Sequence, residues 1–414
     1  MMIYKSDYSI TDISEKLGSL KDSNKTIVIF GTGNYGTLAL HALKKNGITI
    51  DYFCDNNKAN WGTLFCGYPV ISPEQLSAQF SDAVVIIASL RFKYMANQLK
   101  NCPNIHLLNC DFLFAEIDLS DIDASAPIER LIWMLDLYMF AIDSSKNREK
   151  IKIKSLDIVV TEKCSLRCRD CSNLMQYYQK PRDADRDILL ASIDRFMTNV
   201  DELLEARILG GEPFMYKDLP AIIEKLSSYG NCRKITILTN GTLLPRDRVL
   251  ESLKNSKVSL IISDYGKLSK NITGLKTILG QNKIPFIANN IDSWQDCATI
   301  AFRERTDNEL MNLFGDCCVN DTLTLLHGRL YTCPFSAHTD NLKGIPVDQN
   351  EDQIDLIRSN DQQIKEKIRN LYSGKKYLKA CSYCAGRDYN AGRIEVAAQA
   401  SSPIKLKIHE NDAA

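Results

Sequence analysis

The chain has 414 residues, 44% of them hydrophobic, which is enough to build two or three domains with sizeable cores. Lysine plus arginine equals aspartate plus glutamate at 51 each, so no overall basic field indicates binding to nucleic acid or to an anionic membrane. The start of the chain lacks a charged segment followed by an apolar core, and there are 14 cysteines, which together predict a cytoplasmic protein whose thiols bind metal or stay free.

The first predicted unit begins with a strand, a glycine-rich turn and a helix. Residues 25–30 are an apolar strand, and Gly31, Gly33 and Gly36 form a G-x-G-x-x-G turn before the helix. A second strand ends at Asp55, at the distance where a carboxylate that binds a ribose is expected. The pattern predicts a small Rossmann-like parallel sheet that binds a nucleotide at the helix N-terminus, with a scaffold that holds no ligand as the alternative.

Two further segments of this unit carry a resemblance. The second strand ends in Phe-Cys-Asp-Asn at residues 53–56, and Gly-Tyr-Pro-Val-Ile follows at residues 67–71. With the glycine turn, these segments resemble the N-terminal domain of bacterial sugar-nucleotide acetyltransferases and related polysaccharide-locus proteins. The resemblance implies that the domain binds a nucleotide-linked sugar rather than a redox dinucleotide.

A strongly apolar helix is predicted at residues 126–142. It contains Glu129, Arg130 and Asp136 and is too short to span a bilayer. We expect an interdomain or dimer helix that packs on the following domain, and a solvated connection over residues 143–154.

Three cysteines follow a buried strand at residues 155–160. Cys164, Cys168 and Cys171 have C-x3-C-x2-C spacing, which can hold three corners of a cubane iron-sulfur cluster and leave the fourth iron open to a small molecule. A structural zinc site or packed thiols are the alternatives. Structural zinc prefers four closed ligands, and no further cysteine or histidine follows before Cys232.

A second motif follows at the end of the next apolar strand, where the sequence reads Gly210-Gly211-Glu212-Pro213. Its glycines permit close approach of the backbone to a ligand, and Glu212 offers a carboxylate to an ammonium group. With the cysteine spacing, this motif resembles the radical S-adenosylmethionine (SAM) superfamily. The resemblance implies a partial (β/α)6 barrel whose [4Fe-4S] cluster reductively cleaves SAM to a 5'-deoxyadenosyl radical, and it places Gly210, Gly211 and Glu212 at the SAM amino group.

Two later apolar strands end at Asn240 and Ser263. The resemblance implies that both contact the SAM ribose and methionine, and ordinary turn chemistry is the alternative. In the superfamily, the residue before the third cysteine is usually aromatic and packs near the adenine. Here it is Asp170, so packing against the adenine must come from elsewhere.

The C-terminal part carries four more cysteines in two pairs. Cys318, Gly328 and Cys333 give C-x9-G-x4-C, and Cys381 and Cys384 give C-x2-C. The spacing resembles the twitch module, a truncated SPASM domain that holds one auxiliary [4Fe-4S] cluster, so two clusters are expected in all. Zinc is the alternative for this set, because two separated pairs suit tetrahedral coordination.

Two other cysteines leave choices open. Cys317 directly precedes Cys318 and is a possible ligand in its place. An auxiliary cluster held by four thiolates cannot bind SAM, so it would accept or relay an electron. The favoured reaction is therefore oxidation of a hydroxyl-bearing carbon to a ketone, as in the superfamily's sugar-alcohol dehydrogenases. Epimerisation and dehydration are alternatives, and Cys317 or Cys297 would be the hydrogen donor in epimerisation.

These patterns predict a radical SAM enzyme with a carbohydrate-like, possibly nucleotide-linked substrate and an external electron donor such as flavodoxin or ferredoxin. A peptide-modifying maturase and a non-catalytic electron-transfer or scaffold protein are the alternatives, and the oligomeric state is not predicted. No partner nucleic acid and no membrane span are expected. The expected domains are a Rossmann-like unit at 1–115, a helical linker at 116–154, the barrel at 155–310, the twitch module at 311–400 and a tail at 401–414.

Overall fold

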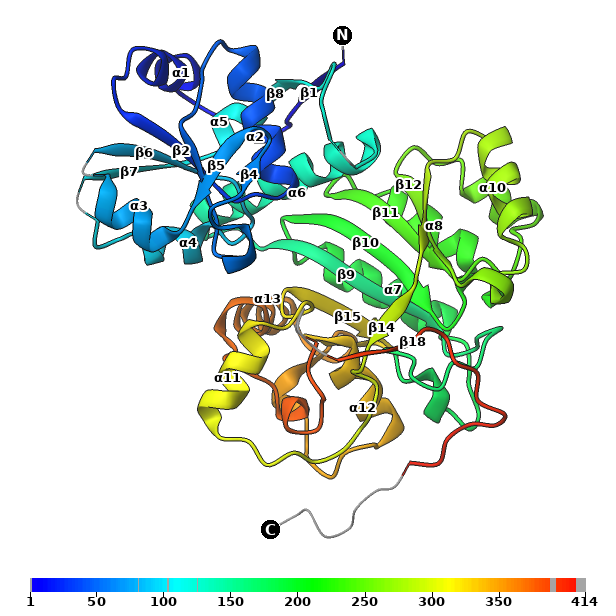
Figure 1. The fold of residues 1–414 in the computed structure, drawn as a ribbon. Helices are drawn as coiled ribbons and strands as arrows, with labels where there is room; N and C mark the ends of the chain where they lie inside the picture. Colours follow the sequence, from blue (N-terminus) through cyan, green and yellow to red (C-terminus); the bar gives the residue numbers. More distant parts are fainter. Residues whose placement is uncertain (1, 81, 103, 125, 388–391, 407–414) are drawn as a thin grey trace. The chain divides into compact units, whose positions relative to one another are not determined.

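The computed structural model describes residues 2–80, 82–102, 104–124, 126–387 and 392–406. It divides the chain into two compact units, Met1–Arg148 and Glu149–Ala414 (Figure 1). Within the described residues, no helix combines the length and the apolar character needed to cross a membrane.

The N-terminal unit is built on a six-stranded sheet in the order β4-β5-β3-β2-β6-β7. Neighbouring strands are parallel except for the pair β4 and β5. The sheet strands are β2 (Thr26–Phe30), β3 (Tyr52–Cys54), β4 (Leu64–Phe65), β5 (Tyr68–Ile71), β6 (Ala83–Ile87) and β7 (Ile105–Asn109). A separate antiparallel pair joins β1 (Ile3–Lys5) to β8 (Glu116–Asp118).

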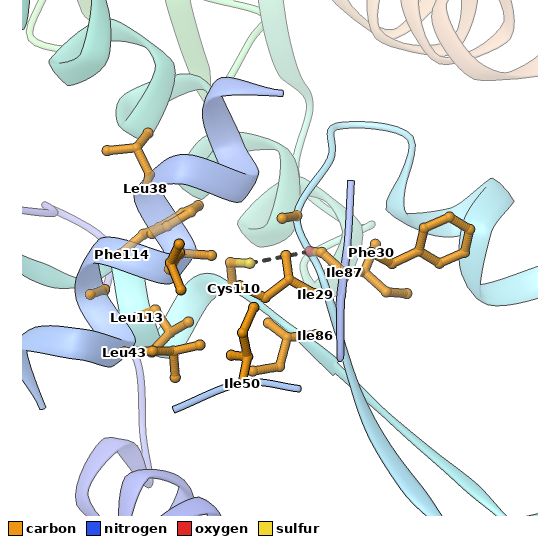
Figure 2. Close-up of a cluster of buried hydrophobic side chains, with 14 of the residues drawn as sticks. Ile29, Phe30, Leu38, Leu43, Ile50, Ile86, Ile87, Cys110, Leu113 and Phe114 are labelled. Atoms are coloured by element: carbon orange, nitrogen blue, oxygen red, sulfur yellow. Dashed lines mark hydrogen bonds between the residues drawn. The ribbon is translucent and has the colours of Figure 1, made fainter. Parts of the chain in front are cut away.

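Among the described residues, the α-helices that accompany this sheet are α1 (Ile13–Lys21), α2 (Asn34–Lys45), α3 (Pro73–Gln79), α4 (Phe92–Gln98), α5 (Asp111–Phe114) and α6 (Ile128–Lys146). Strands β2 and β6 are almost wholly buried, as expected for parallel strands covered on both faces. Figure 2 shows Ile29 and Ile86 of these strands in one cluster with Leu38 of α2 and Phe114 of α5. Beside them, the Cys110 thiol donates a hydrogen bond to the Ile87 carbonyl at 3.3 Å.

Helix α6 packs within this N-terminal unit. Leu131, Leu135 and Tyr138 are buried in the same core as the sheet. The Tyr138 hydroxyl donates to the carbonyl of Ile87 at the end of β6, at 3.0 Å. The apolar side of α6 is therefore used by the first unit, and packing of this helix on the following domain stays a prediction.

The second unit is built on an eight-stranded sheet in the order β13-β12-β11-β10-β9-β15-β16-β17. The first six strands in this order, from β13 to β15, pair in parallel with one another. The pairs β15–β16 and β16–β17 are antiparallel. The sheet strands are β9 (Lys152–Thr161), β10 (Glu202–Gly210), β11 (Cys232–Thr239), β12 (Val258–Asp264), β13 (Phe286–Asn290), β15 (Thr322–Leu326), β16 (Arg329–Tyr331) and β17 (Gln353–Asp355). A small antiparallel pair joins β14 (Ser293–Gln295) to β18 (Arg393–Glu395).

Helices alternate with these strands. They are α7 (Arg186–Met197), α8 (Leu219–Ser227), α9 (Asp247–Ser252), α10 (Ile272–Gln281), α11 (Asp307–Gly315), α12 (Pro334–Leu342) and α13 (Asp361–Arg369). The core of the unit is the apolar inner surface of these helices against the parallel strands, with Ile158, Ile208, Ile237 and Leu260 all at 1% exposure or less. An α/β fold with parallel sheets is therefore confirmed.

The sequence placed a domain boundary after residue 310, and the sheet crosses it. Strand β15 pairs in parallel with β9, so the strand beside the cysteine-bearing strand comes from the segment that we assigned to a separate module. The two segments also belong to one compact unit. A closed (β/α)6 barrel and a separate twitch module stay predictions.

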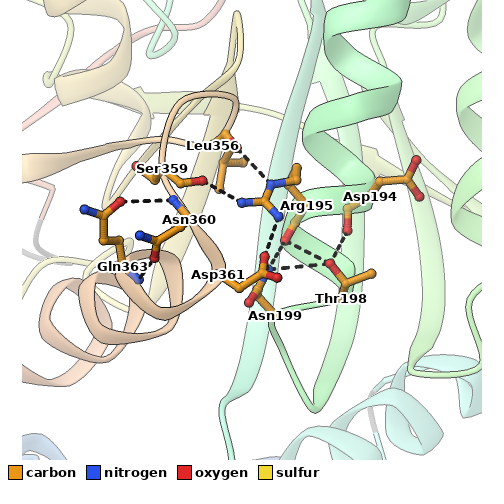
Figure 3. A network of polar contacts seen from close by, with 9 residues as sticks. All are labelled: Asp194, Arg195, Thr198, Asn199, Leu356, Ser359, Asn360, Asp361 and Gln363. Carbon is orange, nitrogen blue, oxygen red and sulfur yellow. Dashed lines mark hydrogen bonds and ion pairs between the residues drawn. The ribbon is translucent and has the colours of Figure 1, made fainter.

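A polar network ties α7 to the segment that leads into α13 (Figure 3). The Arg195 guanidinium forms an ion pair with Asp361 and donates to the Leu356 carbonyl at 3.3 Å. Asn199 donates to the same Asp361 carboxylate at 2.8 Å. These contacts fasten the start of α13 to α7, the helix that follows the cysteine loop.

Candidate active site

The cysteine loop lies at the carboxyl end of β9, which pairs in parallel with β10 on one side and β15 on the other. Gly210 is in register with Thr161 at the end of β9. Strands β11 and β12 lie next along the sheet and end at Thr239 and Asp264. Carboxyl ends of parallel strands meet at one edge of the sheet, where barrel enzymes place their chemistry. The loop that holds Cys164 therefore opens at that edge.

The two glycines of the second motif bring β10 against the cysteine loop. A Cβ atom on Gly210 would stand 2.2 Å from the Thr161 carbonyl oxygen, and one on Gly211 would stand 2.1 Å from that of Lys163. Both distances are far below a van der Waals contact. The close approach that these glycines permit is thus between two segments of the chain, and contact of either glycine with SAM stays a prediction.

Glu212 is completely buried, and three protein donors hold its carboxylate. The Thr239 hydroxyl donates at 2.8 Å, and the backbone amides of Asn240 and Phe214 donate at 2.9 and 3.2 Å. Burial raises the pKa of Glu212 to about 7, although these donors lower it. The carboxylate therefore clamps the ends of β10 and β11 together, and its contact with an ammonium group stays a prediction.

Asn240 reaches the cysteine loop directly. Its side-chain amide donates to the Cys164 sulfur at 3.6 Å and to the Ser165 hydroxyl at 3.2 Å. Its amide oxygen accepts from the Thr242 hydroxyl at 2.6 Å. The structure thus brings Asn240 beside the predicted cluster ligands. Contact of Asn240 with SAM stays a prediction.

Tyr265 is an aromatic residue that the sequence reasoning missed. It follows the end of β12, two residues after Ser263, and its ring packs edge-on against Trp294 with centroids 5.6 Å apart. Burial raises the pKa of Tyr265 to about 12, and the nearby Cys171, Cys168 and Cys164 thiols raise it as well. Tyr265 therefore supplies aromatic surface near the three cysteines, where Asp170 instead pairs with Arg169 at 3.0 Å.

The segment that we expected to lead into a tail covers the cysteine loop. Residues 398–400 run beside residues 167–169, with backbone hydrogen bonds of 2.7 Å from Arg169 to Ala398 and from Ala400 to Arg167. The Gln399 side chain donates to the Cys168 sulfur at 3.3 Å. Of the predicted tail, residues 407–414 lie outside the described residues.

Burial disfavours ionisation of the three thiols of the loop. Burial raises the pKa of Cys164 to about 12 and that of Cys168 to about 11, and it raises the pKa of Cys171 too. Thiolates are the form that binds iron, so loading a cluster here releases protons. Three thiols in one loop, with an amide donor on two of them, are a donor set that fits an iron-sulfur cluster.

The C-terminal cysteines gather around one enclosed apolar pocket. Its lining includes Cys317, Cys333, Cys381 and Cys384. Backbone amides point at two of these sulfurs, from Ser336 to Cys333 at 3.3 Å and from Gly386 to Cys384 at 3.4 Å. Four thiols around one pocket are a donor set that fits a fully ligated iron-sulfur cluster.

The pocket favours Cys317 over Cys318 as the fourth ligand. Cys317 lines it, whereas Cys318 is exposed. Cys297 is buried, and burial raises the pKa of its thiol while the charge of Arg387 lowers it. Within the described residues, no group of three or more cysteine, histidine or acidic side chains has the geometry to hold a single metal ion. The role of Cys297 or Cys317 as a hydrogen donor stays a prediction.

The glycine turn of the N-terminal unit is braced by its own chain. A Cβ on Gly36 would stand 2.1 Å from the Gly31 carbonyl oxygen, and only Gly33 of the three has open space around it. The Asp55 carboxylate accepts from the backbone amide and the hydroxyl of Thr32, at 2.8 and 2.6 Å. Asp55 therefore fixes the turn, and binding of a nucleotide here stays a prediction.

Two separate segments of the chain match known families. Residues 158–263, which contain the three cysteines and the Gly-Gly-Glu motif, match the family model of the Radical SAM superfamily. Residues 158–263 are a radical SAM domain. The superfamily uses a [4Fe-4S] cluster and SAM. Residues 23–105 match a second family, described as C2185-like, N-terminal.

Relatives of the radical SAM domain include GTP 3',8-cyclases. That of Campylobacter jejuni subsp. doylei is 30% identical over 175 residues, which cover 39% of this chain and 51% of the relative. That of Stenotrophomonas maltophilia is 32% identical over 135 residues, which cover 32% and 39%. The chain thus spans about half or less of the length of these relatives.

Among solved structures, BtrN in complex with AdoMet and 2-DOIA is similar with a TM-score of 0.36 and 14% identity, covering 56% of this chain and 93% of that chain.

Proposed function

We propose that this chain reductively cleaves SAM at a [4Fe-4S] cluster held by Cys164, Cys168 and Cys171, and removes a hydrogen atom from a carbohydrate-like substrate. The observation that carries the proposal is the three-thiol loop at the carboxyl end of β9, inside the segment that matches the superfamily. When bound, the cluster supplies the electron that splits SAM into methionine and a 5'-deoxyadenosyl radical.

The residues around the loop have distinct tasks in this proposal. Asn240 and Gln399 donate to the sulfurs of Cys164 and Cys168, which orients the loop and stabilises negative charge on it. Tyr265 and Trp294 offer an apolar face for the adenine, the role that Asp170 cannot fill.

The C-terminal cysteines provide a place for the second electron. A substrate radical on a carbon that bears a hydroxyl loses one proton and one electron to become a ketone, while the 5'-deoxyadenosyl radical has become 5'-deoxyadenosine. A cluster held by Cys317, Cys333, Cys381 and Cys384 would take that electron, since it is fully ligated and cannot bind SAM. The first electron comes from an external donor such as flavodoxin or ferredoxin.

A nucleoside triphosphate is the second candidate substrate. The curated relatives are named GTP 3',8-cyclase, and GTP carries a ribose whose carbons bear hydroxyl groups. Both candidates are therefore sugar-containing compounds, and they differ in whether the product is a ketone.

The test is release of 5'-deoxyadenosine by anaerobically reconstituted, reduced protein given SAM and, in turn, sugar nucleotides, GTP and a peptide mixture. We expect release with a sugar-containing substrate, and deuterium transfer into 5'-deoxyadenosine when the substrate's sugar carbons are deuterated. The variant C164A/C168A/C171A should release none, while Cys66→Ser, which removes an exposed thiol elsewhere, should match the parent. No release with any substrate would reject the proposal, and release only with peptides would reject the carbohydrate assignment.

A further inference from the structure

Arg387 lies at the junction of the two cysteine sites. It follows Cys384 by three residues, and only 6% of its surface is exposed. Its guanidinium donates to the carbonyl of Ser172, the residue after Cys171. Its Nε atom has no hydrogen-bond partner among the described residues. One buried cation thus contacts the radical SAM loop and keeps an unused donor.

The other side of Arg387 faces the C-terminal thiols. Arg387 lines the same apolar pocket as Cys317, Cys333 and Cys384. Cys297 is a further thiol near the guanidinium. Among the described residues, the ionisable groups that bear most on this cation are therefore cysteine thiols, which carry no negative charge until they ionise.

A buried charge is costly unless an opposite charge accompanies it. Neutral thiols do not supply one, whereas an iron-sulfur cluster with four thiolate ligands is anionic and gains one further negative charge on reduction. Because the site is out of water, the attraction between cluster and guanidinium is weakly screened. The guanidinium therefore stabilises the reduced cluster more than the oxidised one.

We propose that Arg387 is a positioning residue that supplies the counter-charge of the auxiliary cluster, raises the cluster's reduction potential and anchors it to the Cys171 loop. This inference rests on the auxiliary cluster of the proposed function. It gives that cluster a specific task, acceptance of the substrate electron, because a raised potential favours acceptance. The contact with Ser172 ties the C-terminal pocket to the residue that follows Cys171.

The test isolates the auxiliary cluster by using the full chain with Cys164, Cys168 and Cys171 replaced by alanine. In this background we expect about four irons per chain and one cluster signal in electron paramagnetic resonance. Arg387→Met should lower the ratio of reduced to oxidised cluster at a given potential at least tenfold. For a one-electron couple, this is a downward shift of the midpoint potential by at least about 59 mV. Arg387→Lys, which keeps the charge, should retain most of the potential.

Arg305→Gln is the matched control. Arg305 donates to the carbonyls of Cys381 and Cys384 at 2.7 and 2.9 Å, but its side chain is partly exposed. Loss of its charge should be screened by water and shift the potential less than Arg387→Met does. An equal or larger shift would contradict the special place of Arg387.

Each other result also decides the question. An unchanged potential in Arg387→Met overturns the role of Arg387 and leaves the proposed function intact. Absence of iron from the parent background overturns the auxiliary cluster and this inference together. If Arg387→Met loses its irons, retention in Arg387→Lys supports the counter-charge, and loss in both shows that the guanidinium shape matters and not its charge.

Discussion

Single residues set how closely the ends of β9 and β10 approach each other. Gly211 lies against the Lys163 carbonyl with no room for a side chain. The Glu212 carboxylate then accepts hydrogen bonds from Thr239 and Asn240 at the end of β11. The cysteine loop is therefore positioned by backbone contact first and by one buried carboxylate second. Together, these two contacts join the ends of β9, β10 and β11.

Gly211→Ala should destabilise the protein by about 1–3 kcal/mol, because the new Cβ collides with backbone that cannot move without displacing Cys164. Its Cβ would stand 2.1 Å from the Lys163 oxygen and 2.9 Å from the Cys164 Cβ. Gly230→Ala is the control, since nothing lies within 4 Å of a Cβ there. Urea unfolding of both variants measures the difference, and equal midpoints would contradict the packing argument.

A buried histidine links α12 to the residues that follow β9 on either side of the three cysteines. His338 is fully buried on α12, and its Nδ1 atom pairs with the Tyr178 hydroxyl at 2.8 Å. Asn341 donates both to that hydroxyl at 2.9 Å and to Glu162 at 2.8 Å. Since the Tyr178 hydroxyl accepts from Asn341, its proton points to His338, which is then neutral.

Burial lowers the pKa of His338 to about 3, while Glu162 acts in the opposite direction. The unfolded chain therefore binds a proton between pH 6.5 and 3 that the folded chain does not, and the free energy of unfolding falls as the pH drops below 6.5. Between pH 7 and pH 5, the His338 imidazole lowers the free energy of unfolding by up to about 2 kcal/mol. In His338→Gln this part of the loss should vanish in urea unfolding of the metal-free protein, and an identical acid slope would contradict the assignment.

At the scale of elements, α11 and the loop behind it choose between two adjacent cysteines. Cys317 turns toward the pocket beside Phe314 of α11, whereas its neighbour Cys318 faces solvent. The sequence spacing favoured Cys318, and the spacing alone carries no information on which side of the chain faces inward.

Cys317→Ser should lower the iron content from about eight to about four per chain, because it removes a ligand of the auxiliary cluster. Cys318→Ser should keep about eight irons, as an exposed thiol outside the pocket holds none. Iron and sulfide analysis of both reconstituted variants makes the comparison. Loss of iron in Cys318→Ser alone would restore the original assignment.

The same contrast explains what the sequence could predict. The ligands Cys164, Cys168 and Cys171 lie in one loop, so their spacing alone indicated a cluster. Arg387 and Gln399 reach that loop across 215 and 231 residues of chain, and no local pattern reports such contacts. For α6, apolar character correctly indicated burial, but periodicity does not say which unit a helix packs against.

At the scale of the whole molecule, the second unit joins the radical SAM domain and the C-terminal cysteines through one sheet. Strand β15 lies beside β9, so the segment bearing the second set of cysteines begins next to the strand bearing the first. A cluster held by the C-terminal cysteines would therefore keep a fixed place relative to the loop of Cys164, Cys168 and Cys171. The N-terminal unit is built around a hydrophobic core of its own.

The central claim is that Cys164, Cys168 and Cys171 hold a cluster with one iron open to SAM. The most direct test is the electron paramagnetic resonance spectrum of the reduced variant C317A/C333A/C381A/C384A, which leaves this cluster alone, recorded with and without SAM. We expect the signal to change on addition of SAM, because the amino and carboxylate groups of SAM bind the open iron. A cluster signal that is the same with and without SAM would contradict the account.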